Sequence, residues 1–340
     1  MRKKRIAVLT SGGGAPGMNT AIRSLTRKGL YNNLEVFGVF HGYEGMIDGE
    51  FVPFDERSVA GIIKEGGSIL KIARSDRFDS LAGFTKALGN LKELRIDAVV
   101  SIGDNKALAN AEKLSAAGVA TIAIPATASN DIPGTEYTLG FDTALNTILQ
   151  AVNKIRDTVS SCDRVAIVEI VGGFSGQLTF MAALASGAEA VLIPERKIDV
   201  EALCDNLLKS SQRGKLYSIV LVTEGAADSY AIADEIAART PFTARVTVLG
   251  HTPRGGAPSA MDSITGSHMG ALAIDCILAD KVNVMIAMRK QELTAVPYGE
   301  LGSRPGIDPS LEELISILAL NEVPSQLEAG DYSHGIYHTI

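Results

Sequence analysis

The chain alternates short apolar runs with longer amphipathic segments, and this alternation limits the fold more than any other feature. Each run is rich in Val, Ile and Leu, which is typical of a strand buried on both faces. Strands that alternate with helices form parallel sheets covered by helices. We therefore predict an α/β fold, with helical segments that include 59–63 and 145–159 and with strands at 6–9, 34–40, 98–102, 119–124, 165–171, 190–193, 219–222, 246–249 and, as the last strand, 282–288.

Length, charge and cysteine content narrow the class of protein. The 340 residues suffice for one large or two medium domains. No window is apolar enough to span a membrane, and the first apolar run ends too early for a secretory signal. The net charge of −7 argues against a general nucleic-acid binder. The cysteines lack metal-ligand spacing, so we expect a cytoplasmic protein with reduced thiols at Cys162, Cys204 and Cys276.

A glycine-rich loop follows the first apolar run. Gly12, Gly14 and Gly17 satisfy the G-x-G-x-x-G pattern between a predicted strand and a predicted helix. The next predicted strand runs into His41 and carries no acidic residue for a ribose hydroxyl. A dinucleotide-dependent oxidoreductase is therefore disfavoured, and we interpret the loop as a tight turn whose helix amides face some anion.

The segment 125–135 reads Pro-Ala-Thr-Ala-Ser-Asn-Asp-Ile-Pro-Gly-Thr and follows the apolar run 119–124. A helical pattern resumes at Thr143. In an α/β sheet, ligands bind at loops beyond the carboxyl ends of strands. The segment is therefore the predicted active loop.

Several short runs resemble the ATP-dependent phosphofructokinases, which phosphorylate fructose 6-phosphate. They are LTSGG at 9–13, APGMN at 15–19, NDI at 130–132, RDT at 156–158, TVLGH at 247–251 and RGG at 254–256. The resemblance extends from residue 6 to about residue 306. It implies two doubly wound parallel-sheet domains with the site in the cleft between them. The expected larger, nucleotide-side domain comprises 1–140 plus 253–303, the smaller sugar-phosphate domain comprises 141–252 plus 304–328, and 329–340 form a C-terminal tail.

The half of the site that binds the sugar phosphate matches the family. A sugar phosphate needs several cations around one dianion and an acid or amide for its hydroxyls. The resemblance assigns these roles to five residues, each of the family's type: Arg164, Arg245, His251, Arg254 and Glu224. It therefore implies binding of fructose 6-phosphate or the bisphosphate.

The catalytic half departs from the family. Ser129 stands where the family has its catalytic aspartate, and the other predicted catalytic residues are Thr127 and Asp131. A serine is too weak a base near neutral pH, and loss of a general base typically costs ~10²–10⁴-fold in rate. Gly14 also replaces an aspartate, and Gly173 replaces an arginine expected at the transferred phosphoryl group.

The loop that binds magnesium in the family is altered as well. The family reads Gly-Gly-Asp-Gly-Ser where residues 103–107 read Gly-Asp-Asn-Lys-Ala. Asn105 thus replaces the metal carboxylate, Asp104 lies one residue early, and Lys106 replaces a glycine that lets the backbone approach phosphate. We therefore predict no metal site and a degraded nucleotide site formed by Gly12, Arg74, Asp104, Asn105 and Lys106.

These departures lead to two hypotheses. The preferred one is a non-catalytic member of the family in glycolysis, a pseudoenzyme that binds fructose phosphates and acts as a regulatory subunit or paralogue with no certain cofactor. The alternative is an active ATP-dependent 6-phosphofructokinase that uses ATP and Mg²⁺. The pyrophosphate-dependent branch is disfavoured, because Lys106 and Ala126 stand where it has an aspartate and a lysine.

The resemblance also implies an allosteric site between subunits for ADP or phosphoenolpyruvate. Glu56 replaces an arginine of that site. We expect a tetramer or dimer, and possible assembly with an active phosphofructokinase. The residues that match the effector pocket are Arg23, Arg27, Arg156, Glu189, Arg213 and Lys215.

Overall fold

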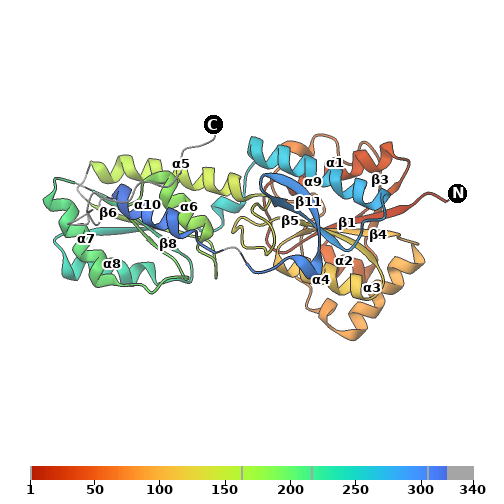
Figure 1. Cartoon of the computed structure of the whole chain (residues 1–340), viewed down its shortest axis with the longest axis horizontal. Coiled ribbons are helices and arrows are strands. Elements are labelled where there is room, and N and C mark those ends of the chain that lie inside the picture. The colour runs from red at the N-terminus through yellow and green to blue at the C-terminus, as the bar shows by residue number, and fades with distance from the viewer. Residues whose placement is uncertain (1, 162–163, 216, 305, 320–340) are drawn as a thin grey trace, which may run out of the picture.

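The computed structural model describes residues 2–161, 164–215, 217–304 and 306–319, and these form two lobes side by side (Figure 1). Each lobe contains one sheet with helices packed against it. The first sheet has the strand order β11-β10-β5-β4-β1-β2-β3, and the second has the order β7-β8-β6-β9. The predicted α/β fold is confirmed, and each apolar run predicted as a strand overlaps an observed strand.

The first sheet is parallel in its centre and antiparallel at both edges. Its parallel strands are β1 (Arg5–Ser11), β2 (Glu35–Val39), β4 (Ala98–Gly103), β5 (Ala120–Pro125) and β10 (Val284–Arg289). The edge strands β3 (Phe51–Phe54) and β11 (Glu292–Pro297) run antiparallel to their neighbours. All six residues of β4 are buried, which fits its largely apolar sequence.

The prediction that 282–288 is the last strand is wrong, because β11 follows it. The two residues between β10 and β11 are Lys290 and Gln291, with φ angles of 51° and 62°. Positive φ at both central residues is typical of the tight turns that join antiparallel strands. Three of the six residues of β11 are exposed, so its sequence lacks the apolar run of a central strand.

Helices α1 (Met18–Tyr31) and α9 (Ala260–Leu278) pack closely in the first lobe, as Figure 1 shows. Gly270 makes this approach possible, because a Cβ atom there would lie 2.4 Å from the carbonyl oxygen of Ala21. The remaining helices of this lobe are α2 (Gly42–Asp48), α3 (Leu81–Glu93) and α4 (Asn105–Ala116), with the 3₁₀ turns η1 (Ile62–Lys64), η2 (Arg77–Asp79) and η4 (Tyr298–Glu300). A further 3₁₀ turn, η3 (Thr252–Arg254), precedes α9.

The predicted helical segment 59–63 is wrong. The chain forms only the 3₁₀ turn η1 there, and Gly61 precedes it with a φ of 77°. A left-handed glycine just before the turn prevents a longer helix from starting upstream.

The second lobe is built on a four-stranded parallel sheet. Its strands are β6 (Val165–Ile170), β7 (Ala190–Leu192), β8 (Ser218–Thr223) and β9 (Ala244–Val248). Its helices are α5 (Phe141–Ser160), α6 (Gln177–Ser186), α7 (Val200–Gln212), α8 (Ser229–Arg239) and α10 (Pro309–Ala319). The chain enters this lobe through α5, returns to the first lobe for α9 and the last strands, and ends its described part in α10 (Figure 1).

Three further expectations concern boundaries, membranes and thiols. The domain boundaries at 140, 252 and 303 stay a prediction, and the tail 329–340 lies outside the described residues. In the part of the chain that the structure describes, no helix is long and apolar enough to cross a membrane. Cys204 and Cys276 are buried free thiols, whereas Cys162 lies outside the described residues.

Candidate active site

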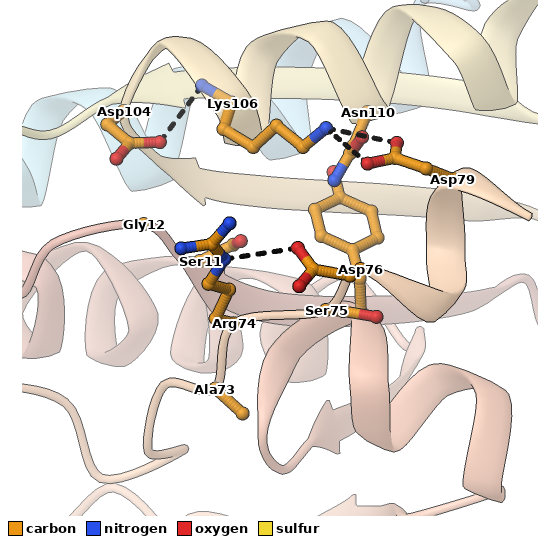
Figure 2. Close-up of a pocket in the computed structure, with 11 residues that line it drawn as sticks. Ser11, Gly12, Ala73, Arg74, Ser75, Asp76, Asp79, Asp104, Lys106 and Asn110 are labelled. Atoms are coloured by element: carbon orange, nitrogen blue, oxygen red, sulfur yellow. Dashed lines mark hydrogen bonds and ion pairs between the residues drawn. The ribbon is translucent and has the colours of Figure 1, made fainter.

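Two cavities adjoin at the first turn of α4, beyond the carboxyl ends of the central strands. The first, which we call the η2 cavity, measures about 490 Å³ and is lined by Ser11, Gly12, Tyr43, Ala73, Arg74, Ser75, Asp76, Asp79, Asp104, Lys106 and Asn110 (Figure 2). The second, the active-loop cavity, measures about 350 Å³ and is lined by Gly13, Gly14, Asp104, Asn105, Lys106, Thr127, Ala128, Ser129, Asp131 and Arg254. Asp104 and Lys106 line both cavities and mark their junction.

Asp104 joins the first glycine loop to α4. Its Oδ1 accepts hydrogen bonds from the backbone nitrogens of Lys106 (3.0 Å) and Ala107 (3.2 Å), which makes it the N-cap of α4. Its Oδ2 accepts a hydrogen bond of 3.2 Å from the backbone nitrogen of Gly13. Although Asp104 was expected to lie one residue early in the loop, it lines both cavities.

Gly12 makes room for this carboxylate. Its φ is +94°, and a Cβ atom built there would lie 2.2 Å from Cγ of Asp104. Only glycine combines that backbone conformation with so close an approach. The glycine loop is therefore shaped around Asp104.

The side chain of Lys106 extends across the η2 cavity to Asp79, as Figure 2 shows. Its Nζ lies 2.7 Å from Oδ2 and 3.0 Å from Oδ1 of Asp79. The hydrogen bond from Lys106 lowers the pKa of the Asp79 carboxyl below its ordinary value. Lys106 thus lies in the η2 cavity, and its charge is paired with an acid that the sequence had not indicated.

The wall that carries Asp79 is anchored to α2 and α3. Arg77 binds both Glu44 and Asp48, the latter through Nη2 at 2.8 Å from Oδ1. Phe78 is fully buried between the rings of Tyr43 and Phe84, with centroid distances of 4.5 and 5.3 Å. These contacts hold the η2 turn firmly.

Arg74, which the sequence analysis assigned to the nucleotide site, lines the same cavity. Its side chain is 89% exposed and pairs with Asp76 at 3.1 Å. An ion pair this exposed adds little stability, so the Arg74 guanidinium is free to approach a ligand.

The active loop places Asp131 in the second cavity. Burial raises the pKa of its carboxyl above the ordinary value, and the charge of Asp104 adds to the rise. Two interactions offset part of this rise in pKa. Arg304 lies 3.6 Å from the carboxylate, and Nδ2 of Asn105 donates a hydrogen bond of 3.1 Å to it. A partly buried carboxyl with a raised pKa in a cleft is a candidate general base.

Ser129 and Thr127 line the same cavity, and the backbone nitrogen of Ser129 donates to Oγ1 of Thr127 at 3.2 Å. Between the serine and Asp131, Asn130 adopts a left-handed conformation with φ 49° and donates from Nδ2 to the carbonyl of Glu136 at 3.0 Å. This turn holds Ser129 and Asp131 in the same cavity, so the loop presents one hydroxyl and one carboxyl to a substrate.

The carboxylates of the active-loop cavity are relevant to the prediction that the chain has no metal site. No cluster of three or more His, Cys, Asp or Glu that would form a metal cage occurs among the described residues. Mg²⁺ in phosphoryl-transfer sites needs only one or two carboxylates together with substrate phosphates. Asp104, which lines both cavities, supplies one such carboxylate, so the residues present fit a magnesium ion whose other ligands include substrate phosphate oxygens.

The structure divides the five residues predicted to bind the sugar phosphate. Arg254 lines the active-loop cavity, and Glu224 and His251 are exposed just beyond β8 and β9. Arg164 and Arg245 instead line a separate cavity of about 400 Å³, together with Lys154 and the α5 side chains Ile155, Thr158 and Val159. Of these five residues, Arg254 alone lines the cavity that contains Asp131.

The predicted effector residues fall into two groups. Lys215 forms an ion pair with Glu189, and Arg156 donates to the carbonyl of Ser186 at the end of α6. Arg213 lies at the carboxyl end of α7 in the same lobe, whereas Arg23 and Arg27 are on α1 in the other lobe. Among five cavities of the described residues, one is lined by Glu189 and another by Lys215, and none of the five is lined by more than one of these six residues.

Sequence reasoning missed Asp79, Tyr43 and Asn110 of the η2 cavity, and Arg304 beside Asp131. Asp79 belongs to a 3₁₀ turn with no periodic pattern, and its partner Lys106 is 27 residues away. The hydroxyl of Tyr43 is buried against Ser101 at 2.8 Å, and its sequence context is that of an ordinary core aromatic.

Comparison with known proteins gives consistent results for sequence and structure. A family model described as phosphofructokinase matches residues 5–277. The ATP-dependent 6-phosphofructokinase of Shouchella clausii is 41% identical over 318 residues, covering 93% of this chain and 100% of that protein. The ATP-dependent 6-phosphofructokinase of Halothermothrix orenii is 44% identical over 331 residues, again covering 93% of this chain and 100% of that protein.

Solved structures agree on the fold. Pichia pastoris phosphofructokinase in the T-state aligns with a TM-score of 0.85 and 27% identity, over 94% of this chain and 37% of that chain. The chain thus spans little more than a third of that relative. The pyrophosphate-dependent phosphofructokinase of Nitrosospira multiformis aligns with a TM-score of 0.82 at 16% identity, over 93% of this chain and 92% of that chain.

Proposed function

The chain belongs to the phosphofructokinase family, and from this we propose that it is an ATP-dependent 6-phosphofructokinase that transfers the γ-phosphoryl group of ATP to fructose 6-phosphate in glycolysis. The observation that carries the proposal is the pair of carboxylates, Asp104 and Asp131, in a cavity that adjoins the η2 cavity. Relatives that match over their full length bear the same name. This proposal adopts the alternative of the sequence analysis in place of its preferred pseudoenzyme.

The two carboxylates suit two different tasks. Asp131 lines only the active-loop cavity and has a raised pKa, which brings its basicity closer to that of a useful general base. It takes the place of the missing base at Ser129 and accepts the proton of the attacking hydroxyl. Asp104 lines both cavities and would hold Mg²⁺ between them. When bound, Mg²⁺ supplies neutralising charge to the phosphate oxygens.

The other site residues position the substrates. Arg254 supplies the cation for the phosphate of the sugar in the active-loop cavity. Arg74 and the wall at η2 bind the nucleotide in the first cavity. Ser129 and Thr127 present hydroxyl groups that hydrogen-bond the sugar, and they take no part in proton transfer.

A specific contact favours a second candidate, the non-catalytic regulatory subunit. The Asn105 amide donates to Oδ2 of Asp131 and thereby occupies one of its acceptor positions. In that case the chain binds fructose 6-phosphate or the bisphosphate, forms a dimer or tetramer, and assembles with an active phosphofructokinase. ADP or phosphoenolpyruvate would then act through the effector residues Arg156, Glu189 and Lys215.

Release of ADP from ATP, fructose 6-phosphate and Mg²⁺ separates the two candidates. The kinase proposal expects turnover in the ordinary range of ~1–100 s⁻¹, and a loss of ~10²–10⁴-fold in kcat for Asp131→Asn with KM nearly unchanged. The matched variant Ser129→Asp adds the family's carboxylate and is expected to rescue Asp131→Asn. No turnover by the unaltered chain, together with calorimetric binding of fructose 6-phosphate that Arg254→Ala abolishes, would establish the regulatory candidate instead.

A further inference from the structure

Among the described residues, Lys106 is the one basic residue that lines both the η2 cavity and the active-loop cavity. Arg74 lines the η2 cavity alone and Arg254 lines the active-loop cavity alone, whereas Lys106 lines both. A phosphoryl group that passes from a donor in the η2 cavity to an acceptor in the active-loop cavity crosses this junction. The Lys106 side chain therefore starts at this junction, and its ammonium group lies in the η2 cavity beside Asp79.

The charges around the junction make a cation necessary. The side chains that line the two cavities include four acids, Asp76, Asp79, Asp104 and Asp131, against three cations, Arg74, Lys106 and Arg254. A polyphosphate brings several negative charges into surroundings that already carry an excess of acid. Cations that contact its oxygens must offset this repulsion.

A bound ligand can replace Asp79 as the partner of Lys106. The side chains of Lys106 and Asp79 are 55% and 50% exposed. Exposed ion pairs contribute little net stability, because water solvates both partners. Asp79 is on the anchored η2 turn, and Lys106 has a flexible stem, so Lys106 is the partner that moves.

We propose that Lys106 is a phosphate-binding residue of the donor site, and that the terminal phosphates of the nucleotide replace Asp79 as its partner. The proposal rests on the proposed function for the identity of the donor, and it gives Lys106 a binding role where the sequence analysis expected a degraded nucleotide site. Asp79 holds the lysine extended across the cavity and competes with the phosphates for its charge. Lys106 thus makes donor affinity depend on the number of phosphates, even without a divalent cation.

Calorimetric binding of ATP, ADP and AMP to the unaltered chain and its variants tests this, both with Mg²⁺ and with a chelator. Lys106→Met is expected to weaken ATP and ADP at least tenfold and AMP less than twofold. Lys106→Arg retains the charge and is expected to restore most of the ATP affinity. Asp79→Asn removes the competitor and is expected to tighten ATP several-fold. Lys86→Met, which removes an exposed lysine paired with Asp48 at 3.5 Å, is the matched control and leaves all three affinities unchanged.

The outcomes distinguish this inference from the proposed function. If ATP binds and turns over but Lys106→Met binds it as tightly as the unaltered chain, the inference is wrong and the kinase proposal stands. If the binding pattern holds while no ADP is released with fructose 6-phosphate, the inference stands and the kinase proposal fails. Equal weakening of ATP and AMP by Lys106→Met, or no nucleotide binding by the unaltered chain, also overturns the inference. Thermal unfolding of each variant confirms that the fold is retained.

Discussion

The carboxylate of Asp262 on α9 accepts a 2.7 Å hydrogen bond from the hydroxyl of Tyr137, although Asp262 has no exposed surface. Asp262 also accepts from the backbone nitrogens of Gly140 (2.7 Å) and Thr143 (2.9 Å), at the start of α5. Burial and the charge of Asp262 raise the pKa of the Tyr137 hydroxyl, which keeps its proton for donation. A buried acid of the first lobe therefore caps the helix that enters the second.

Replacement of this acid provides the first prediction. Asp262→Asn keeps the shape but turns one acceptor into a donor that faces other donors, so buried hydrogen bonds are lost. We expect a loss of about 2–4 kcal/mol in the free energy of unfolding. Asp275→Asn, on the same helix and in an exposed pair with Lys28, is the control and should change stability by less than about 0.5 kcal/mol. Denaturant titration measures both, and an equal effect would contradict the capping role.

The glycine loop supports a second prediction. Gly12→Ala forces a Cβ atom against the Asp104 carboxyl and requires a side chain at a φ of +94°. Loss of the α4 cap together with backbone strain is expected to cost about 2–4 kcal/mol and to weaken nucleotide binding. Gly14→Ala is the matched control, since a Cβ atom there meets nothing closer than Ile72 Cδ1 at 3.9 Å. Thermal unfolding and nucleotide titration of both variants check this, and an unperturbed Gly12→Ala chain would refute it.

Asp131 gives a prediction about pH. Its pKa is raised in the folded protein, so between the unfolded value of about 3.9 and the folded pKa the folded state binds more protons than the unfolded state. Stability contributed by this group is therefore lost as the pH rises through that window. Asp131→Asn removes the effect, and we expect the variant to be more stable than the unaltered chain at neutral pH, with a smaller difference below about pH 4. Unfolding curves from pH 3 to 8 measure it, and a pH-independent difference would exclude the assignment.

The central strands could be predicted from sequence because they are buried on both faces. β4 and β8 have only buried residues, and their sequences are largely apolar. The edge strands β3 and β11 could not be predicted in this way, because half or more of their residues are partly or fully exposed and each contains a proline. Antiparallel pairing at an edge depends on tertiary neighbours more than on local pattern.

The site was predictable where it follows strand ends and unpredictable where it depends on distant pairs. The loops after β4 and β5 carry Asp104 and Asp131, and both were candidates from sequence. The partnership of Lys106 with Asp79 joins two loops through tertiary structure, and no spacing indicates it. Motif matching grouped Arg164 and Arg245 with Arg254, whereas the structure places the pair in another cavity.

That separation leads to the last prediction. Arg164 and Arg245 lie in a cavity formed by α5, β6 and β9, away from the Asp131 of their own chain. If they complete the sugar site of a neighbouring subunit, their effect on binding depends on assembly. Arg254→Ala is expected to weaken fructose 6-phosphate by about 1.5–3 kcal/mol at any protein concentration. Arg164→Ala is expected to weaken fructose 6-phosphate binding only where the chain is oligomeric. Mixed oligomers of the Arg164→Ala and Arg254→Ala chains are expected to recover binding, because some of their sites contain both arginines. Calorimetry paired with analytical ultracentrifugation tests both variants. Equal losses for Arg164→Ala in monomer and oligomer, with no rescue on mixing, would show that these arginines do not serve a shared site.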